Sequence, residues 1–160
     1  MKRYLIVSDT HGRDTGLGTV ILREEPFDVL IHLGDVEGSE NIIESLAKGK
    51  KCIFLRGNND FFVPNPREME LEIGTHRALL THGHYYGVSL GYERLAEEAA
   101  SRGCDIAMCG HTHKPTDFFL GTTRILNPGS ISFPRQENHI GTYIVLTEDE
   151  GEIKSRIYYV

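Results

Sequence analysis

Long apolar runs are absent from this sequence. No stretch approaches the roughly 20 apolar residues that a helix needs to cross a bilayer, so we expect no membrane partner. The basic residues Lys2 and Arg3 are followed only by the short apolar run Tyr4–Val7, whereas the apolar core of a secretory signal has ~7–15 residues. With neither signal in the sequence, we expect a cytoplasmic protein.

Cysteine is scarce, and the number of cysteines is odd. The three residues are Cys52, Cys104 and Cys109, and an odd count in a chain of this size argues against a disulfide framework. We expect them to be small apolar residues of the core. A structural zinc site built on Cys104, Cys109 and His111 has no clear fourth ligand, so we reject it.

A basic excess is also missing. The formal net charge is −6 and the pI is near 5.7, which gives no strong signal of nucleic-acid binding. Bound divalent cations could still create a locally positive site. The chain has 160 residues, 39% of them hydrophobic, and no linker, repeat or low-complexity tract. We therefore expect one domain over residues 1–160; the oligomeric state, including a homo-oligomer, stays open.

Short apolar runs alternate with helix-like segments in the first two-thirds of the chain. The expected strands are Tyr4–Ser8, Val29–Leu33, Cys52–Leu55, Ala78–Thr81 and Ile106–Cys109. The expected helices are Gly18–Glu25, Ser39–Lys48 and Tyr92–Arg102, with Ser39 as an N-cap. This alternation predicts an α/β domain with parallel strand pairs. In the last third we expect only strands, Thr123–Leu126, Thr142–Thr147 and Ile153–Tyr159, the last two as a hairpin.

Each of the five apolar runs ends in a glycine-containing loop that carries Asp, Asn or His. In chain order these loops are Ser8–Gly12, Gly34-Asp35, Gly57–Asp60, His82–His84 and Gly110–His113. Ligands of open α/β sheets bind beyond the carboxyl ends of the strands, so all five loops should converge at one edge. One such loop alone would be ordinary turn chemistry. Five in order predict a shared site.

The side chains in these loops are of the types that bind metals. Aspartate, asparagine and histidine supply oxygen and nitrogen donors to borderline or hard divalent ions. Asp9 and His11, like His111 and His113, are spaced i, i+2, so extended backbone beyond the strands would place both members of each pair on the same side. The glycines would let the backbone turn sharply and leave room beside a packed metal centre.

The motifs Asp-x-His, Gly-Asp, Gly-Asn-x-Asp, His-Gly-His and Gly-His-x-His, in this order, resemble those of the calcineurin-like metallophosphoesterase superfamily. Within it, the chain is similar to the small bacterial and archaeal phosphodiesterase family. The resemblance spans residues 3 to about 135 and includes the turn Asn127–Ser130. It implies an α/β fold, a four-layer αββα sandwich of two mixed β-sheets flanked by helices. It also implies a metal-dependent phosphodiesterase acting on a phosphate-ester substrate.

The resemblance further implies two divalent metal ions and their ligands. By similarity, the ligands of one ion are Asp9, His11 and His113. The ligands of the other are Asn58, His82 and His111, and Asp35 bridges the two ions. Mn²⁺ is the expected metal, with Fe, Ni, Zn or Mg as alternatives. A hydroxide bridging such a pair would attack a phosphate diester in line with the leaving group.

Position 59 departs from the family pattern. Many relatives carry His, or Cys in some small members, where this chain has Asn59, and an amide cannot act as a general acid near neutral pH. We interpret this as an enzyme that favours substrates with good leaving groups, or that takes the proton from water or from His84. We expect Asp60 to orient Asn59 or its loop. Asn59, Asp60 and His84 complete the predicted catalytic set.

Other polar residues have weaker assignments. Arg56 and Arg135 lie beside the site loops and either contact phosphate or form surface ion pairs. We expect His32 to be a packed, hydrogen-bonded strand residue, and His76 and His139 to be surface residues.

Two alternatives bear on function. The superfamily includes a retromer scaffold subunit with an impaired metal site, so a scaffold or protein-binding module with vestigial activity is the alternative; the complete ligand set favours an enzyme. Gly87–Gly91 matches the G-x-S-x-G nucleophile elbow of serine hydrolases, but no strand directly precedes Ser89. We expect Ser89 to cap the following helix instead.

Overall fold

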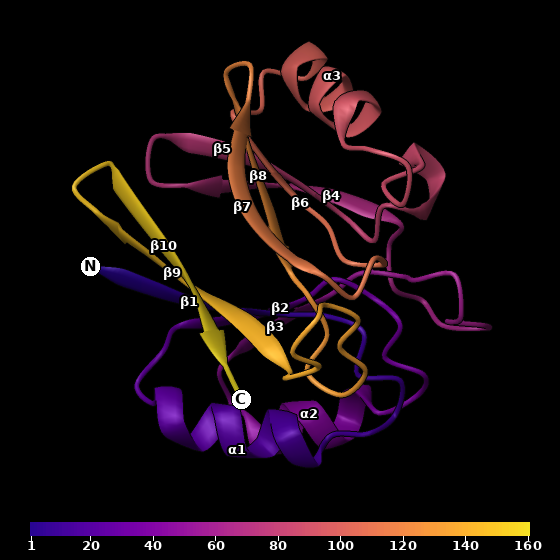
Figure 1. Cartoon of the computed structure of the whole chain (residues 1–160). Coiled ribbons are helices and arrows are strands. Elements are labelled where there is room, and N and C mark those ends of the chain that lie inside the picture. Colours follow the sequence, from indigo (N-terminus) through magenta and orange to yellow (C-terminus); the bar gives the residue numbers. More distant parts are fainter.

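Two five-stranded β-sheets lie face to face in the computed structural model, which describes residues 1–160 (Figure 1). The first sheet has the order β10-β9-β1-β2-β3. Its strands are β1 (Lys2–Val7), β2 (Val29–His32), β3 (Lys51–Phe54), β9 (Thr142–Asp149) and β10 (Glu152–Tyr159). The second sheet has the order β4-β5-β6-β8-β7. Its strands are β4 (Glu68–Ile73), β5 (His76–Thr81), β6 (Ile106–Met108), β7 (Pro115–Leu120) and β8 (Thr123–Pro128).

Helices cover the outer faces of the two sheets. Helices α1 (Thr15–Glu24) and α2 (Glu40–Leu46) lie outside the first sheet, and α3 (Glu93–Ser101) lies outside the second (Figure 1). The four-layer αββα order is therefore confirmed. No helix of the structure is long and apolar enough to cross a membrane.

Strand β1 shows how the sequence builds these layers. Successive side chains of a strand point to opposite faces of its sheet. Leu5 and Val7 belong to the core cluster shared with α1 and α2, whereas Tyr4 and Ile6 belong to the cluster between the two sheets. Because both faces of β1 are buried, the strand is apolar at every one of these positions rather than alternating.

The pairing of the strands brings their carboxyl ends to one edge. Strands β1, β2 and β3 are parallel neighbours in the first sheet, and β5, β6 and β8 are parallel neighbours in the second. The remaining neighbours are antiparallel, including the β9–β10 hairpin expected around residues 148–151. Both sheets are therefore mixed, as expected, and the loops after the parallel strands meet.

Strands β4 and β7 were not expected, and each lies at an edge of the second sheet. In β4 the glutamates alternate with Met69, Leu71 and Ile73, and Ile73 is fully buried between the sheets. In β7 most side chains are partly or fully exposed, and the strand begins at Pro115. Edge strands with one solvated face have a weaker apolar signal than buried strands, which explains why both were missed.

The helix boundaries also differ from the expected ones. Helix α1 begins at Thr15, before the expected start at Gly18. Ser39 does precede α2, but its hydroxyl donates to the Val36 carbonyl and does not cap the helix. The residue preceding α3 is Tyr92, so the capping role predicted for Ser89 was wrong.

His76 connects β5 to the turn of the β9–β10 hairpin. Its Nδ1 lies 2.6 Å from Asp105 Oδ2, and its Nε2 lies 3.0 Å from the Gly151 carbonyl. The hydrogen bond to Asp105 raises the pKa of His76 above its ordinary value. Burial alone would raise the pKa of Asp105, but the hydrogen bonds from the Arg77 amide and His76 lower it. His76 is thus held by two partners, which is more than a plain surface residue has.

These two shifts predict a pH-dependent contribution to stability. The contribution of His76 is complete below the unfolded-state pKa of about 6.5 and is lost as the pH rises through the raised folded-state pKa. The contribution of Asp105 is present above about pH 4 and is lost below it. We expect His76→Gln to lower the free energy of unfolding by up to about 1 kcal/mol at pH 5.5 and by less at pH 8.5.

Urea unfolding of wild type and His76→Gln at both pH values measures this difference. His139→Gln is the matched control, because His139 is exposed and its Nδ1 lies 3.4 Å from the Pro134 carbonyl, near the limit of a hydrogen bond. An equal loss of stability at pH 5.5 and pH 8.5 would show that the ion pair contributes nothing.

Candidate metal centre

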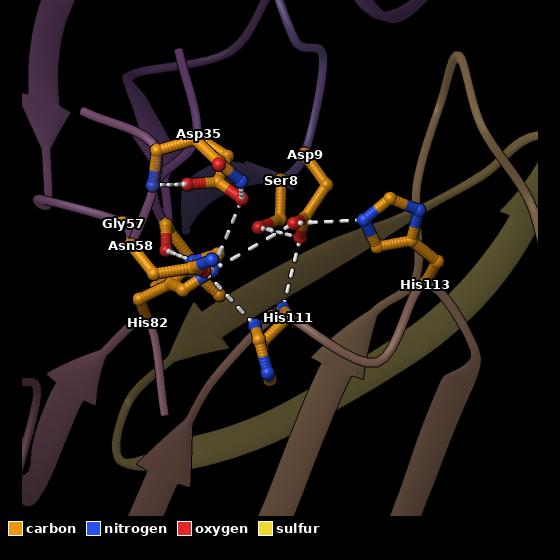
Figure 2. Close-up of polar contacts among 12 residues, drawn as sticks. Ser8, Asp9, Asp35, Gly57, Asn58, His82, His111 and His113 are labelled. Atoms are coloured by element: carbon orange, nitrogen blue, oxygen red, sulfur yellow. Dashed lines mark hydrogen bonds and ion pairs between the residues drawn. The ribbon is translucent and has the colours of Figure 1, made fainter. Parts of the chain in front are cut away.

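The five polar loops meet where the two sheets come together. Hydrogen bonds join the loops directly: the Asp9 amide donates to the Gly34 carbonyl at 3.0 Å, and the Gly110 amide donates to the His82 carbonyl at 3.0 Å. The loops after β1, β2, β3, β5 and β6 thus form one continuous edge. Figure 2 shows the side chains from these loops turned toward one another.

The backbone at this edge is left-handed, not extended. Five of the seven predicted ligand residues have positive φ angles between 48° and 69°, namely Asp9, His11, Asp35, His111 and His113. This conformation is uncommon for residues other than glycine and persists only where surrounding structure enforces it. The expectation that extended backbone places each i, i+2 pair on one side was therefore wrong. Left-handed turns bring the two pairs together instead.

The first group of donors comes from the loops after β1 and β6. His113 Nε2 lies 3.2 Å from Asp9 Oδ1 and 3.2 Å from His11 Nε2. His11 Nε2 also lies 3.8 Å from Asp9 Oδ1. These three atoms could all contact a single ion.

The second group lies on the other side of Asp9 and Asp35. His82 Nε2 is 3.4 Å from Asp35 Oδ2 and 3.8 Å from Asp9 Oδ1. Asn58 Oδ1 is 3.0 Å from His82 Nε2 and 3.1 Å from His111 Nδ1. Asp35 Oδ2 also lies 3.6 Å from His11 Nε2, so its carboxylate faces both groups. The structure thus brings all seven predicted ligand residues together, and all of them except His11 are labelled in Figure 2.

The second ring nitrogen of two histidines is held by an acceptor outside the centre. His82 Nδ1 lies 2.8 Å from the Leu33 carbonyl, and His113 Nδ1 lies 2.7 Å from the Phe133 carbonyl. In both rings, donation from Nδ1 fixes the tautomer with a free lone pair on Nε2, which is the arrangement of metal-binding histidines. His11 Nδ1 lies 3.3 Å from Glu37 Oε2 without forming a hydrogen bond.

Asp9 leaves a polar atom without a partner inside the protein. Its side chain is fully buried, and Oδ2 accepts hydrogen bonds from Ser8 Oγ at 2.5 Å and from the His111 amide at 3.0 Å. Oδ1 has no hydrogen-bond partner at all. An unsatisfied buried carboxylate oxygen is costly, and this one points at imidazole nitrogens from both groups. The donor set and the orphaned oxygen both fit divalent metal ions.

The close packing of carboxylates and imidazoles shifts the pKa values of His82 and Asp35. Burial alone would lower the pKa of His82, but the hydrogen bond to Asp35 and the charges of Asp9 and Asp35 raise it to about 9. Burial would raise the pKa of Asp35, and its contacts with His82 and Asn59 lower it instead. A metal-binding imidazole must be neutral. Metal binding at His82 would therefore release a proton.

Two glycines leave no room for a side chain beside the carboxylates. A Cβ atom at Gly57 would overlap Asp35 Oδ1 and the Asp35 amide, and one at Gly110 would overlap Ser8 Oγ and Asp9 Oδ2. Both clashes involve the tightly packed groups of the centre itself. The predicted role of the loop glycines in leaving room is thus visible at these two positions.

Asn59 and Asp60 organise the loops of the first sheet. The Asn59 side-chain amide donates to Asp35 Oδ2 at 3.0 Å, and its backbone amide donates to Asp35 Oδ1 at 2.9 Å. Buried Asp60 accepts from the amides of Asp35, Glu37 and Gly57 at 2.7–2.8 Å. Asn59 therefore orients a ligand residue, and Asp60 ties the loop after β3 to the loop after β2.

The remaining predicted residues take different places. The ring of His84 lies 5.4 Å from that of His82 and 6.0 Å from that of His111, and burial lowers its pKa to about 4. Arg56 lines a cavity beside Asn58, and Arg135 lines a separate cavity with Lys114. Neither arginine pairs with a carboxylate. His32 is buried and bonded to Thr10 Oγ1 at 2.9 Å, as expected.

Three supporting residues escaped sequence reasoning. They are Ser8, Glu37 and Ser130. Ser130 Oγ donates to the Asp9 carbonyl at 2.8 Å, across more than a hundred residues of chain. Ser8 and Ser130 each belong to a segment already singled out, the loop Ser8–Gly12 and the turn Asn127–Ser130, but neither was assigned a role. Glu37 carried no signal, because its role depends on the loop conformation.

Comparisons with known proteins find relatives along most of the chain. The model of the calcineurin-like phosphoesterase superfamily domain matches residues 2–151. The probable metallophosphoesterase YsnB of Bacillus subtilis is 32% identical over 157 residues, covering 96% of this chain and 89% of that protein. Phosphodiesterase YfcE of Escherichia coli is 30% identical, covering 86% of this chain and 84% of that protein.

Solved structures share the same architecture. A predicted phosphoesterase from Streptococcus pneumoniae has a TM-score of 0.83 at 28% identity, covering 99% of this chain and 89% of that one. Zinc-bound Vps29 from Entamoeba histolytica has a TM-score of 0.79 at 20% identity, with 98% of each chain covered; this likeness concerns the fold alone. The chain therefore belongs to the calcineurin-like phosphoesterase superfamily.

Proposed function

We propose that this protein is a metal-dependent phosphodiesterase. One observation supports the proposal above the others: seven donor side chains from five loops converge in two groups around Asp9 and Asp35, and Asp9 Oδ1 has no partner in the protein. Membership of the phosphoesterase superfamily supplies the reaction class. The name phosphodiesterase of the relative YfcE supports a diester substrate.

The ligands fall into two proposed sets. Asp9, His11 and His113 would hold one ion, with Mn²⁺ as the expected metal. Asn58, His82 and His111 would hold the other, and Asp35 faces both. Bound ions of this kind act as Lewis acids toward phosphoryl oxygens and supply a nucleophile at neutral pH.

The protein's own groups then decide which esters are favoured. Asn59 is committed to Asp35 by two hydrogen bonds and has no proton to give near neutral pH. The ring of His84 stands beside the second group of donors, and its Nδ1 has no hydrogen-bond partner. Because Nδ1 is buried, we expect the other ring nitrogen of His84, Nε2, to donate a hydrogen bond to the bound ester. Because position 59 has no acid to protonate the leaving group, esters with good leaving groups, which depart without a proton, should react fastest.

A scaffold or protein-binding module with vestigial activity is the alternative to an enzyme. A scaffold would not need its metal-binding residues, so these positions could carry other residue types, and hydrolysis would be weak or absent. All seven ligand positions here carry competent donors, and histidine tautomers and the Asp9 carboxylate are already arranged for ions. These features support the enzyme over the scaffold.

Metal removal and restoration test the proposal. After chelation, we expect the protein to hydrolyse bis(p-nitrophenyl) phosphate at no measurable rate, and added Mn²⁺ to restore hydrolysis in a saturable manner. The same titration with Mg²⁺ and Zn²⁺ identifies the preferred ion. A protein that binds Mn²⁺ but hydrolyses no activated diester would favour the scaffold instead.

A further inference from the structure

A cavity of about 280 Å³ opens beside the second group of donors. The residues that line it include Arg56, Asn58, Phe61, Arg67, His84 and Tyr85. Asn58 is one of the proposed metal ligands, and His84 stands against His82. The cavity is therefore the place where one ester arm of a substrate bound at the metal centre would lie.

Two arginines in this cavity have no carboxylate partner. Arg56 Nε donates to the Asp60 carbonyl at 3.3 Å, and the Arg67 guanidinium lies over the Tyr85 ring at 4.8 Å from its centroid. By contrast, four arginines elsewhere form ion pairs, namely Arg3, Arg77, Arg102 and Arg124. In a chain with a net charge of −6, two free guanidinium groups beside one cavity form a site for an anion. Guanidinium groups bind phosphate oxygens through paired hydrogen bonds.

Exposed aromatic rings adjoin the same arginines. Phe61 is 68% exposed and Tyr85 is 55% exposed, and both line the cavity. An exposed aromatic ring can stack against a planar ligand, and the stacking removes apolar surface of both from water. Arg67 lies over the Tyr85 ring, and the His84 ring is 4.3 Å from it, so Phe61 supplies the open flat face. The cavity thus offers an exposed aromatic face next to positive charge, a combination that can bind a nucleobase together with a phosphate.

We propose that this cavity binds a nucleoside arm that carries a second phosphate group. The substrate class would be short phosphorylated nucleotides in which the scissile phosphodiester joins a nucleoside bearing a further phosphate. This inference rests on the proposed phosphodiesterase function and adds its substrate class. A cavity of this size, in a chain with a net charge of −6, suits such a small ligand rather than a long polymer.

Three p-nitrophenyl phosphodiesters with the same leaving group separate the contributions. Bis(p-nitrophenyl) phosphate has no nucleoside. Thymidine 5′-(p-nitrophenyl phosphate) adds the nucleoside, and its 3′-phosphorylated form adds the second phosphate. For the Mn²⁺-loaded wild type, we expect kcat/KM to rise about tenfold or more on addition of the 3′-phosphate, as for charge-assisted hydrogen bonds to arginine.

Arg67→Gln is the informative variant, because the Arg67 side chain makes no hydrogen bond within the protein, whereas Arg56 also holds the loop of Asp60. We expect it to abolish the preference for the 3′-phosphorylated substrate, so that the ratio of the two kcat/KM values falls to about one. Arg156→Gln is the matched control, since Arg156 is exposed and lies over the Tyr158 ring but far from this cavity in the β10 strand. It should keep the wild-type ratio.

Calorimetric binding of thymidine 3′,5′-bisphosphate and thymidine 5′-monophosphate gives a readout that does not depend on turnover. Wild type and Arg156→Gln should bind the bisphosphate about tenfold more tightly than the monophosphate. Arg67→Gln should bind the two nucleotides with equal affinity. Hydrolysis of all three diesters with no preference, and equal binding of the two nucleotides, would overturn the substrate class but leave the phosphodiesterase intact. Hydrolysis of none of the diesters would overturn both.

Discussion

Replacing Asp35 by asparagine should lower kcat/KM for an activated phosphodiester by about 100-fold or more. Asp35 Oδ2 faces His82 Nε2 at 3.4 Å and His11 Nε2 at 3.6 Å, so its carboxylate lies close to both donor groups. Asparagine keeps the size but removes the negative charge that would offset two cations. Its amide would also face the two donors of Asn59, which now bind the carboxylate. Steady-state rates at saturating Mn²⁺ measure the loss.

The matched control is Asp28→Asn. Asp28 is exposed and accepts a hydrogen bond from the Arg3 amide, outside the centre. It should keep the wild-type rate and the Mn²⁺-dependent rise in melting temperature that ligand binding produces, while Asp35→Asn loses most of that rise. Wild-type activity in Asp35→Asn would show that this carboxylate does not hold the metal ions.

Gly57→Ala should also reduce activity by about 100-fold, because it displaces Asp35 rather than removing a donor atom. The added methyl group would overlap the Asp35 carboxylate and amide, and a displacement of about 1 Å in a catalytic group can have this effect. Overpacking should lower the free energy of unfolding by about 1–3 kcal/mol. Activity and urea unfolding of the same preparation report both effects.

Gly18→Ala is the comparison for this substitution. Gly18 lies inside helix α1, and a Cβ atom there would meet only Leu46 methyl groups at 3.8–4.0 Å. Alanine is favoured over glycine in a helix, so we expect Gly18→Ala to raise the free energy of unfolding by about 0.5–1 kcal/mol with unchanged activity. A fully active Gly57→Ala protein would mean that the loop after β3 can shift without disturbing Asp35.

The location of the candidate site could be predicted because its residues follow strands. Polar side chains directly after buried apolar runs, such as Asp9 after β1 and Asp35 after β2, must lie at the carboxyl edge of parallel strands. The four-layer arrangement came from resemblance, since apolar runs alone do not say which strands pair. The edge strands β4 and β7 were missed because their exposed faces dilute the apolar pattern.

The local geometry of the site could not be predicted. Positive φ angles such as those at Asp9 and His111 are uncommon for residues other than glycine, and the packed loops enforce them. The acceptors that orient the histidines are backbone carbonyls, such as those of Leu33 and Phe133. Any residue supplies a carbonyl, so its role has no sequence signal. The stacking of Arg67 on Tyr85 likewise joins segments whose contact depends on the finished fold.

The number of Mn²⁺ ions bound per chain tests the central proposal most directly. Chelator-treated protein is equilibrated with Mn²⁺, and bound metal is measured in wild type, Asp35→Asn and Asp28→Asn. We expect two ions per chain in wild type and Asp28→Asn, and fewer than two with weaker binding in Asp35→Asn. No bound Mn²⁺ in wild type, or equal binding in all three proteins, would contradict a metal centre built on Asp9, Asp35 and the convergent histidines.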